Sequence, residues 1–369
     1  MQFLDLKKQY ESIKDEIEVS IKRVLDDGVF IGGKEVLEFE KELKEFLGVK
    51  NAITLNSGTD ALFLSLKALE IGAGDEIITT TFTFIATAEI ILNLGAKPVF
   101  ADIKDDTFNI DPEEIEKRIT PKTKAIIPVH LFGKPAEMER ILEIAKKHKL
   151  YVIEDAAQAI GAKYKGNSAG TMGDTGAFSF FPSKNLGAFG DGGLVTTNNS
   201  DLADKIMLLK NHGSSSDSKY FNLVSGINSR LDSIQAAILR VKLKHLNDWN
   251  RKRLENSRYY NFQLKEVKEI ILPDAFDGDV FNQYTIKAKN RDTLKKYLES
   301  KEIATAVYYP LPLHLQPAFK ELGYKQGDFP LSEKAGREVL SLPIYPEISK
   351  KDQDLIIEAI KSFYQNGKK

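Results

Sequence analysis

One lysine stands out by its place in the sequence. Lys184 follows an apolar, aromatic run, residues 177–181, that is typical of a strand, and it precedes a glycine-rich stretch that ends at Gly193. Glycine has no side chain, so such a stretch lets the backbone approach another group closely. Most lysines are solvated surface residues, and this is the alternative for Lys184 when it is taken alone.

Two further features have residue types that suit the same chemistry. Asp155 ends the strand-like run 151–155, and Ser57-Gly58-Thr59 stands at the expected start of a helix. Each alone is also typical of a simple helix cap. Together with Lys184 they match what pyridoxal phosphate requires: an amine for its aldehyde, backbone N–H groups at a helix start for its phosphate, and a carboxylate for its pyridine nitrogen.

The remaining contacts to such a cofactor can be assigned by position. Gly58, Thr59 and Ser183 could hold the phosphate through backbone N–H groups and hydroxyls. Phe84, near the end of a strand-like run, could stack on the pyridine ring. A place in the hydrophobic core is an equally good interpretation for any one phenylalanine.

Alternating strands and helices must position these residues. Strand-like runs separated by amphipathic helices occur at 52–55, 76–80, 97–101, 124–129 and 151–153. This alternation predicts an α/β fold with a mostly parallel sheet covered on both faces, in which ligands bind at the carboxyl ends of strands. Before the first strand, the spacing predicts one helix over 8–25 and another over 35–47, closed by Gly48.

The last third of the chain lacks the regular alternation of strands and helices. Charge density rises around residues 249–258, and a strand at 284–289 and a helix at 292–300 follow. We therefore expect a large domain at residues 1–250 and a smaller α+β domain at residues 251–369.

Composition excludes several classes of function. Lys and Arg number 52 against 53 Asp and Glu, so the balance of charge gives no reason to expect a nucleic-acid or membrane partner. There is no cysteine, and the five histidines are scattered without metal-ligand spacing, so we expect no metal. No signal peptide or membrane-length apolar run occurs, and a cytoplasmic protein is the simplest expectation.

In the order and type of these residues, the chain resembles the DegT/DnrJ/EryC1/StrS family of pyridoxal-phosphate-dependent sugar aminotransferases over nearly its whole length. The resemblance implies the type I aminotransferase fold. The motifs that carry it are residues 3–6 (FLDL), 56–62 (NSGTDAL), 152–158 (VIEDAAQ), 181–187 (FPSKNLG) with 190–193 (GDGG), and 228–232 (NSRLD).

The resemblance implies roles for individual residues. Lys184 would form a Schiff base with the cofactor and later move the proton, and Asp155 would pair with the pyridine nitrogen. Gln158 would contact the ring's 3-oxygen. Asn228 would reach the phosphate from a neighbouring subunit, so the active site would need a homodimer. Arg230 is a candidate for the nucleotide's pyrophosphate, with a surface ion pair as the alternative.

The resemblance also implies the reaction. An amino group would pass from L-glutamate to a keto carbon of a dTDP- or UDP-linked sugar, for surface polysaccharide or a related glycoside. Relatives with histidine in place of Lys184 remove a hydroxyl instead, so lysine favours transamination. Residues 306–317 and 339–343 look like the branch that acts on 3-keto sugars, with Tyr309 and His314 as sugar-facing candidates; His314 could equally be structural. The alternatives are a 4-keto sugar aminotransferase, a sugar dehydratase and a regulatory protein.

Overall fold

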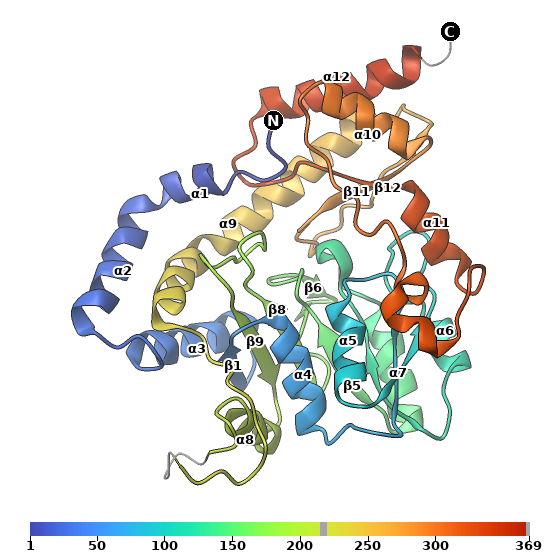
Figure 1. Ribbon diagram of the computed structural model, residues 1–369. Helices are drawn as coiled ribbons and strands as arrows, with labels where there is room; N and C mark the ends of the chain where they lie inside the picture. The colour runs from blue at the N-terminus through green and yellow to red at the C-terminus, as the bar shows by residue number, and fades with distance from the viewer. Residues whose placement is uncertain (215–219, 367–369) are drawn as a thin grey trace.

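The computed structural model of the chain describes residues 1–214 and 220–366. A sheet of seven strands forms its centre (Figure 1). β8 pairs antiparallel with β9, β9 pairs antiparallel with β1, and the other neighbours are parallel, so the expected mostly parallel sheet is confirmed. In spatial order the strands are β1 (Asn51–Leu55), β9 (Gly193–Thr197), β8 (Thr175–Ser179), β5 (Tyr151–Asp155), β4 (Thr123–Ile127), β2 (Glu76–Thr80) and β3 (Lys97–Ala101).

Helices cover both faces of this sheet. Successive residues of a strand point to opposite faces, so Ala125 and Ile127 of β4 pack toward one helical layer and Ile126 toward the other. The first layer contains α4 (Gly58–Ala68), α5 (Ala86–Asn93) and α8 (Ser200–Leu209). The second contains α3 (Lys34–Leu47), α6 (Pro112–Lys117), α7 (Met138–His148) and the first half of α9 (Ser233–Leu264). This double covering is the α/β fold that the sequence predicts.

The N-terminal segment corrects one expectation. In place of a single helix over 8–25, the chain forms α1 (Leu6–Ser12) and α2 (Lys14–Asp27). Ile13 between them has φ −129° and ψ 17°, and Ser12 donates its hydroxyl to the Gln9 carbonyl. The apolar residues keep a helical spacing across the bend, since both helices pack against the same partner: Ile13 and Ile17 both contact α9. The next helix, α3, does end at Gly48, whose φ of 71° suits glycine.

A second, smaller sheet lies beyond the large one. It consists of β10 (Ile270–Ile271), β11 (Tyr284–Ala288) and β12 (Val339–Leu342), all antiparallel. It packs with α10 (Arg291–Ser300) and α12 (Lys350–Asn366) around a separate hydrophobic core. Figure 1 shows α9 running as one long helix from α3 to this part. Residue 250 falls within α9, and the domain division at that residue stays a prediction.

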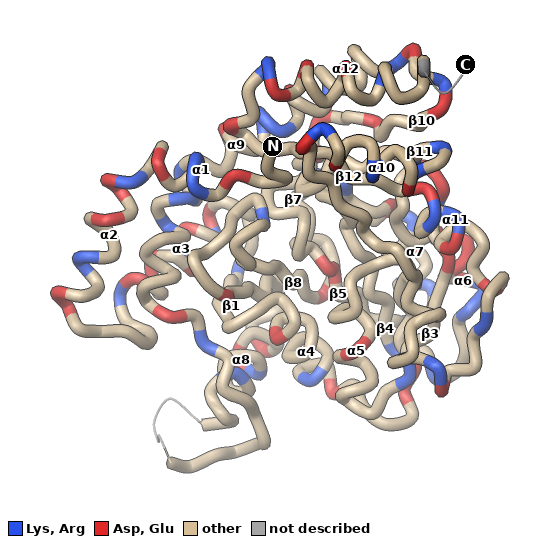
Figure 2. Tube along the Cα trace, turned by 45° about the horizontal axis from the view of Figure 1, so that its top comes forward, with Lys and Arg blue, Asp and Glu red and all other residues tan. Residues whose placement is uncertain are grey.

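Shorter elements complete the chain. They are the two-stranded ribbon β6 (Lys163–Tyr164) and β7 (Asn167–Ser168), the 3₁₀ helices η1 (Leu131–Gly133), η2 (Leu313–Leu315) and η3 (Pro317–Leu322), and α11 (Pro330–Glu338). Charges of both signs alternate along outer helices such as α2 and α12 (Figure 2). Within the described ranges, no helix combines the length and apolarity needed to cross a lipid bilayer.

Candidate active site

A pocket of about 590 Å³ opens where β5 and β8 end and α4 begins. This is the carboxyl edge of the parallel strands, where ligands bind in such folds. The fold brings most of the residues singled out in the sequence to its lining: Gly58, Thr59, Phe84, Asp155, Gln158, Ser183, Lys184 and Tyr309.

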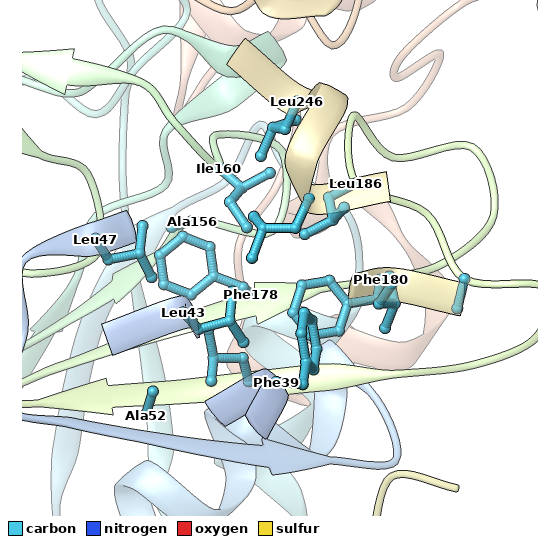
Figure 3. Close-up of a cluster of buried hydrophobic side chains, with 14 of the residues drawn as sticks. Phe39, Leu43, Leu47, Ala52, Ala156, Ile160, Phe178, Phe180, Leu186 and Leu246 are labelled. Atoms are coloured by element: carbon cyan, nitrogen blue, oxygen red, sulfur yellow. The ribbon is translucent and has the colours of Figure 1, made fainter. Parts of the chain in front are cut away.

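Lys184 lies in this pocket on a loop that is anchored on both sides. Phe178 and Phe180 before it, and Leu186 after it, are fully buried in a cluster with side chains of α3 (Figure 3). Desolvation lowers the pKa of Lys184 from 10.5 to about 8, although the charge of Asp155 acts in the opposite direction. No hydrogen bond holds its Nζ within the described part of the chain. With this pKa the amine is mostly protonated at pH 7, but it loses its proton far more readily than an exposed lysine.

A network of buried amides fixes the residue after the lysine. Asn185 donates through Nδ2 to Asn250 Oδ1 (2.7 Å) on α9 and to the Val280 carbonyl (2.9 Å). Its own Oδ1 accepts from Asn282 Nδ2 at 2.9 Å. Asn250 in turn donates to the Ile160 carbonyl. The position of the Lys184 backbone thus depends on α9 and on the segment that leads to the small sheet.

Asp155 is buried at the end of β5. Its Oδ2 accepts from the Thr87 hydroxyl at 2.8 Å and its Oδ1 from the Ala157 N–H at 3.2 Å. Burial raises the pKa of Asp155, and the Thr87 and Ala157 bonds and the charge of Lys184 only partly oppose this. A buried carboxylate that lacks full compensation has a strong preference for a cation beside it.

The N-terminus of α4 forms another wall. Ser57 caps the helix by accepting from the Asp60 N–H at 3.0 Å, and the N–H groups of Gly58 and Thr59 have no intrahelical acceptor. A Cβ atom on Gly58 would lie 2.8 Å from Ser179 Cβ, so only glycine allows this close approach. Backbone donors and the helix dipole together make an anion site.

Ser179 itself was missed by the sequence analysis. It ends β8, lines the pocket and lies directly against Gly58. The signal that could have found it is the alternation of the strand, because Phe178 and Phe180 point into the core and the residue between them must point to the other face. Ser183, which was predicted, also lines the pocket but is exposed.

Gln158, Tyr309 and Phe84 meet on the far side of the pocket. Gln158 Oε1 accepts from the Phe132 N–H at 2.6 Å, which turns its Nε2 toward the Tyr309 hydroxyl at 3.3 Å. The Tyr309 and Phe84 ring centroids are 6.4 Å apart. Phe84 is 56% exposed, so it is a pocket residue, whereas the neighbouring Phe82 takes the place in the core.

Three candidates lie outside this lining. Asn228 and Arg230 are exposed, and Arg230 lines a different hollow beside α8. His314 is only 2% exposed; its Nδ1 is 2.8 Å from the Thr81 hydroxyl and its Nε2 is 3.2 Å from Glu333 Oε1. Both ring nitrogens are thus engaged inside the fold, so the structure does not bring His314 to the pocket as a sugar-facing residue.

The residues present fit pyridoxal phosphate. One pocket is lined by an amine with a lowered pKa, by a buried carboxylate that favours a cation, and by a helix N-terminus whose Gly58 lies directly against Ser179. Among residues 1–214 and 220–366, no cluster of His, Asp or Glu has the arrangement of a metal site.

Comparison with known proteins agrees with this geometry. The family model described as the DegT/DnrJ/EryC1/StrS aminotransferase family matches residues 11–361. The chain is 50% identical to a pleiotropic regulatory protein of Geobacillus stearothermophilus, over 98% of each chain. It is 47% identical to a UDP-N-acetyl-3-dehydro-alpha-D-glucosamine 3-aminotransferase of Acidithiobacillus ferrooxidans, over 94% of this chain and 93% of the relative. The crystal structure of NtdA from Bacillus subtilis with bound cofactor PMP superposes with a TM-score of 0.93 at 35% identity, covering 99% of this chain and 85% of NtdA.

Proposed function

Because the chain belongs to the DegT/DnrJ/EryC1/StrS aminotransferase family, we propose that it moves an amino group from L-glutamate to the C3 keto carbon of a sugar carried on dTDP or UDP. Its enzyme class is aminotransferase and its cofactor is pyridoxal phosphate. The observation that carries the proposal is the pocket in which Lys184 and Asp155 line the same space as the N-terminus of α4.

Each wall of the pocket has a task in this proposal. Bound pyridoxal phosphate would supply an electron-accepting ring and a carbon that exchanges amino groups. The N–H groups of Gly58 and Thr59, with the Ser179 hydroxyl, would bind its phosphate. Asp155 would hold a positive charge on the ring nitrogen. Lys184 Nζ, with a pKa of about 8, would accept and return a proton near neutral pH.

The choice of C3 rests on two supports. The Acidithiobacillus relative is named for a 3-dehydro sugar and a 3-aminotransferase activity. The segment around Tyr309, which resembles the 3-keto branch, contributes Val307, Tyr308 and Tyr309 to the pocket. In the proposal these side chains contact the sugar ring and decide which keto carbon faces the cofactor.

The proposed enzyme is a homodimer. Asn228 and Arg230 are exposed and do not line the Lys184 pocket of their own chain. This position suits residues that contribute to the active site of a second subunit. Val29, Phe30 and Ile31 form an apolar run that is about half exposed, and such a run is typical of a surface that a second copy covers.

Colour and product together test the proposed reaction. The purified protein should show the visible absorbance of lysine-bound pyridoxal phosphate, and Lys184→Ala should abolish it. Incubation with L-glutamate and a panel of 3-keto and 4-keto dTDP and UDP sugars should yield 2-oxoglutarate and a 3-amino sugar, identified by NMR. An amino group at C4 would refute the C3 assignment. Release of water without use of glutamate would identify a dehydratase. A colourless protein without turnover would leave a regulatory function.

Mixed dimers test the shared site. Lys184→Ala and Asn228→Ala should each be inactive alone, because each damages both sites of its homodimer. After mixing and subunit exchange, each heterodimer would contain one intact site, and about a quarter of wild-type activity should return for random pairing in equal amounts. No recovery, although mass spectrometry detects heterodimers, would rule out a contribution of Asn228 from the neighbouring subunit.

A further inference from the structure

Two buried threonines lie beside the carboxylate of Asp155 in the pocket wall. Thr87, in the first turn of α5, is 1% exposed and donates its hydroxyl to Asp155 Oδ2 at 2.8 Å. The Thr83 hydroxyl is 3.2 Å from the Thr87 hydroxyl and is also buried. A threonine hydroxyl has one hydrogen, and that of Thr87 goes to the carboxylate, so Thr83 must be the donor of the second bond. The two hydroxyls form a directed chain that ends at Asp155.

The direction of the Thr87 hydroxyl is unusual for a helix. A threonine there commonly donates to the carbonyl three or four residues earlier. Thr87 bonds instead to a side chain on β5, 68 residues further along the chain. Valine has the same branched shape without a hydroxyl, so side-chain shape alone does not require threonine at this position.

Several other groups act on the Asp155 carboxylate, and their effects differ from that of the Thr87 hydroxyl. The charges of Lys184 and His130 favour the ionised carboxylate, and Tyr309 is a further titratable side chain close to it. The Ala157 N–H is 3.2 Å from Oδ1, so the Thr87 bond to Oδ2 is the shorter of the two hydrogen bonds to the carboxylate. Asp155 also lines the pocket. Thr83 and Thr87 line the same pocket, so Thr87 fixes one carboxylate oxygen at the pocket wall.

We propose that Thr87, supported by Thr83, is a positioning residue of the aminotransferase: its hydroxyl fixes the direction of the Asp155 carboxylate and favours its ionised form, which holds the cationic ring nitrogen of the cofactor. The inference deepens the proposed function and rests on the role of Asp155 in it. A hydrogen bond to a charged group changes affinity by about tenfold to a hundredfold.

Pyridoxamine phosphate is the suitable probe, because it binds the pocket without a covalent bond to Lys184. In Thr87→Val, its dissociation constant at pH 7.5 should rise by at least about tenfold. Affinity should also be lost at a higher pH than in the wild type as the pH falls, because without the Thr87 bond the carboxylate takes up its proton earlier. Thr87→Ser, which keeps the hydroxyl, should retain both properties.

Thr79→Val is the matched control. Thr79 is fully buried on β2 and donates its hydroxyl to the Ile127 carbonyl at 2.8 Å, so it loses a bond of the same length outside the pocket lining. It should lower the unfolding temperature and leave the dissociation constant unchanged. Wild-type affinity and pH profile in Thr87→Val would overturn the inference and leave the proposed function standing. An equal loss of affinity in Thr79→Val would have the same meaning. A wild-type protein that binds no pyridoxamine phosphate would overturn the proposed function as well.

Discussion

Replacing Lys184 with methionine should stabilise the cofactor-free protein. Desolvation lowers the pKa of Lys184 from 10.5 to about 8, so the fold destabilises the charged amine. The difference corresponds to about 3.4 kcal/mol, at 1.36 kcal/mol for each pKa unit. This value already includes the attraction to Asp155. Methionine has a similar shape and no charge, and because the Lys184 side chain is partly exposed, screening by water reduces the expected gain. We therefore expect the free energy of unfolding to rise by about 1–3 kcal/mol at pH 7.

Lys242 supplies the matched control for this experiment. Burial lowers its pKa to about 8 as well. Unlike Lys184, it donates from Nζ to the Gly187 carbonyl at 2.7 Å, and its Nζ lies 4.6 Å from the centroid of the Phe189 ring. Lys242→Met leaves that carbonyl without its donor, which costs about 1–3 kcal/mol. It should therefore be neutral or destabilising, although the pKa of its lysine is the same.

Urea unfolding of the cofactor-free variants, at one protein concentration between pH 7 and pH 10, measures the effect. The folded pKa lies below the unfolded one, so the unfolded chain binds the extra proton between about pH 8 and 10.5. The cost of the buried charge is complete below pH 8 and fades as the pH rises through this window. The advantage of Lys184→Met should shrink in parallel. No gain at pH 7, or a gain that stays constant up to pH 10, would refute the reasoning.

Three shorter predictions concern other parts of the site. Gly58→Ala should raise the dissociation constant of pyridoxamine phosphate about tenfold or more, because its Cβ would lie 2.8 Å from Ser179 Cβ; equilibrium dialysis measures it, and an unchanged constant contradicts the close approach. Asn250→Leu should lower the free energy of unfolding by about 2–4 kcal/mol, since it removes one acceptor of Asn185 Nδ2 and the donor to the Ile160 carbonyl; a loss below about 1 kcal/mol in urea would argue against the network. His314→Asn should lower the unfolding temperature with no change in the KM for the sugar nucleotide, because the ring is buried between Thr81 and Glu333; a raised KM at wild-type stability would return His314 to the sugar.

Sequence reasoning could place the residues of the site whose structure depends on their neighbours in the sequence. Ser57 and Gly58 precede a run with helical spacing, so a helix start was predictable there, and the structure confirms it. Asp155 follows apolar residues of a strand, and in a parallel sheet the end of a strand is where the ligand edge lies. In both cases neighbours within a few residues carried the information.

The parts that it could not place depend on contacts distant in the sequence. His314 is buried because it meets Thr81, 233 residues away. Asn250 bonds to Asn185, 65 residues earlier in the chain, and no local pattern around either residue indicates this contact. Thr87 carries no local sign of a role, since its partner Asp155 lies on another element. Such pairs become visible only when the chain has folded.

The position of β1 has a consequence for the order in which the protein forms. β1 lies at the edge of the large sheet and pairs with β9, so residues 51–55 find their sheet neighbour about 140 residues later. Ser57 and Gly58 follow β1 directly, and Gly193 of β9 approaches Ser57 so closely that a Cβ there would lie 2.2 Å from the Ser57 carbonyl oxygen. During synthesis on the ribosome, the anion site can therefore close only after residue 197 has emerged, when most of the parallel strands are already available.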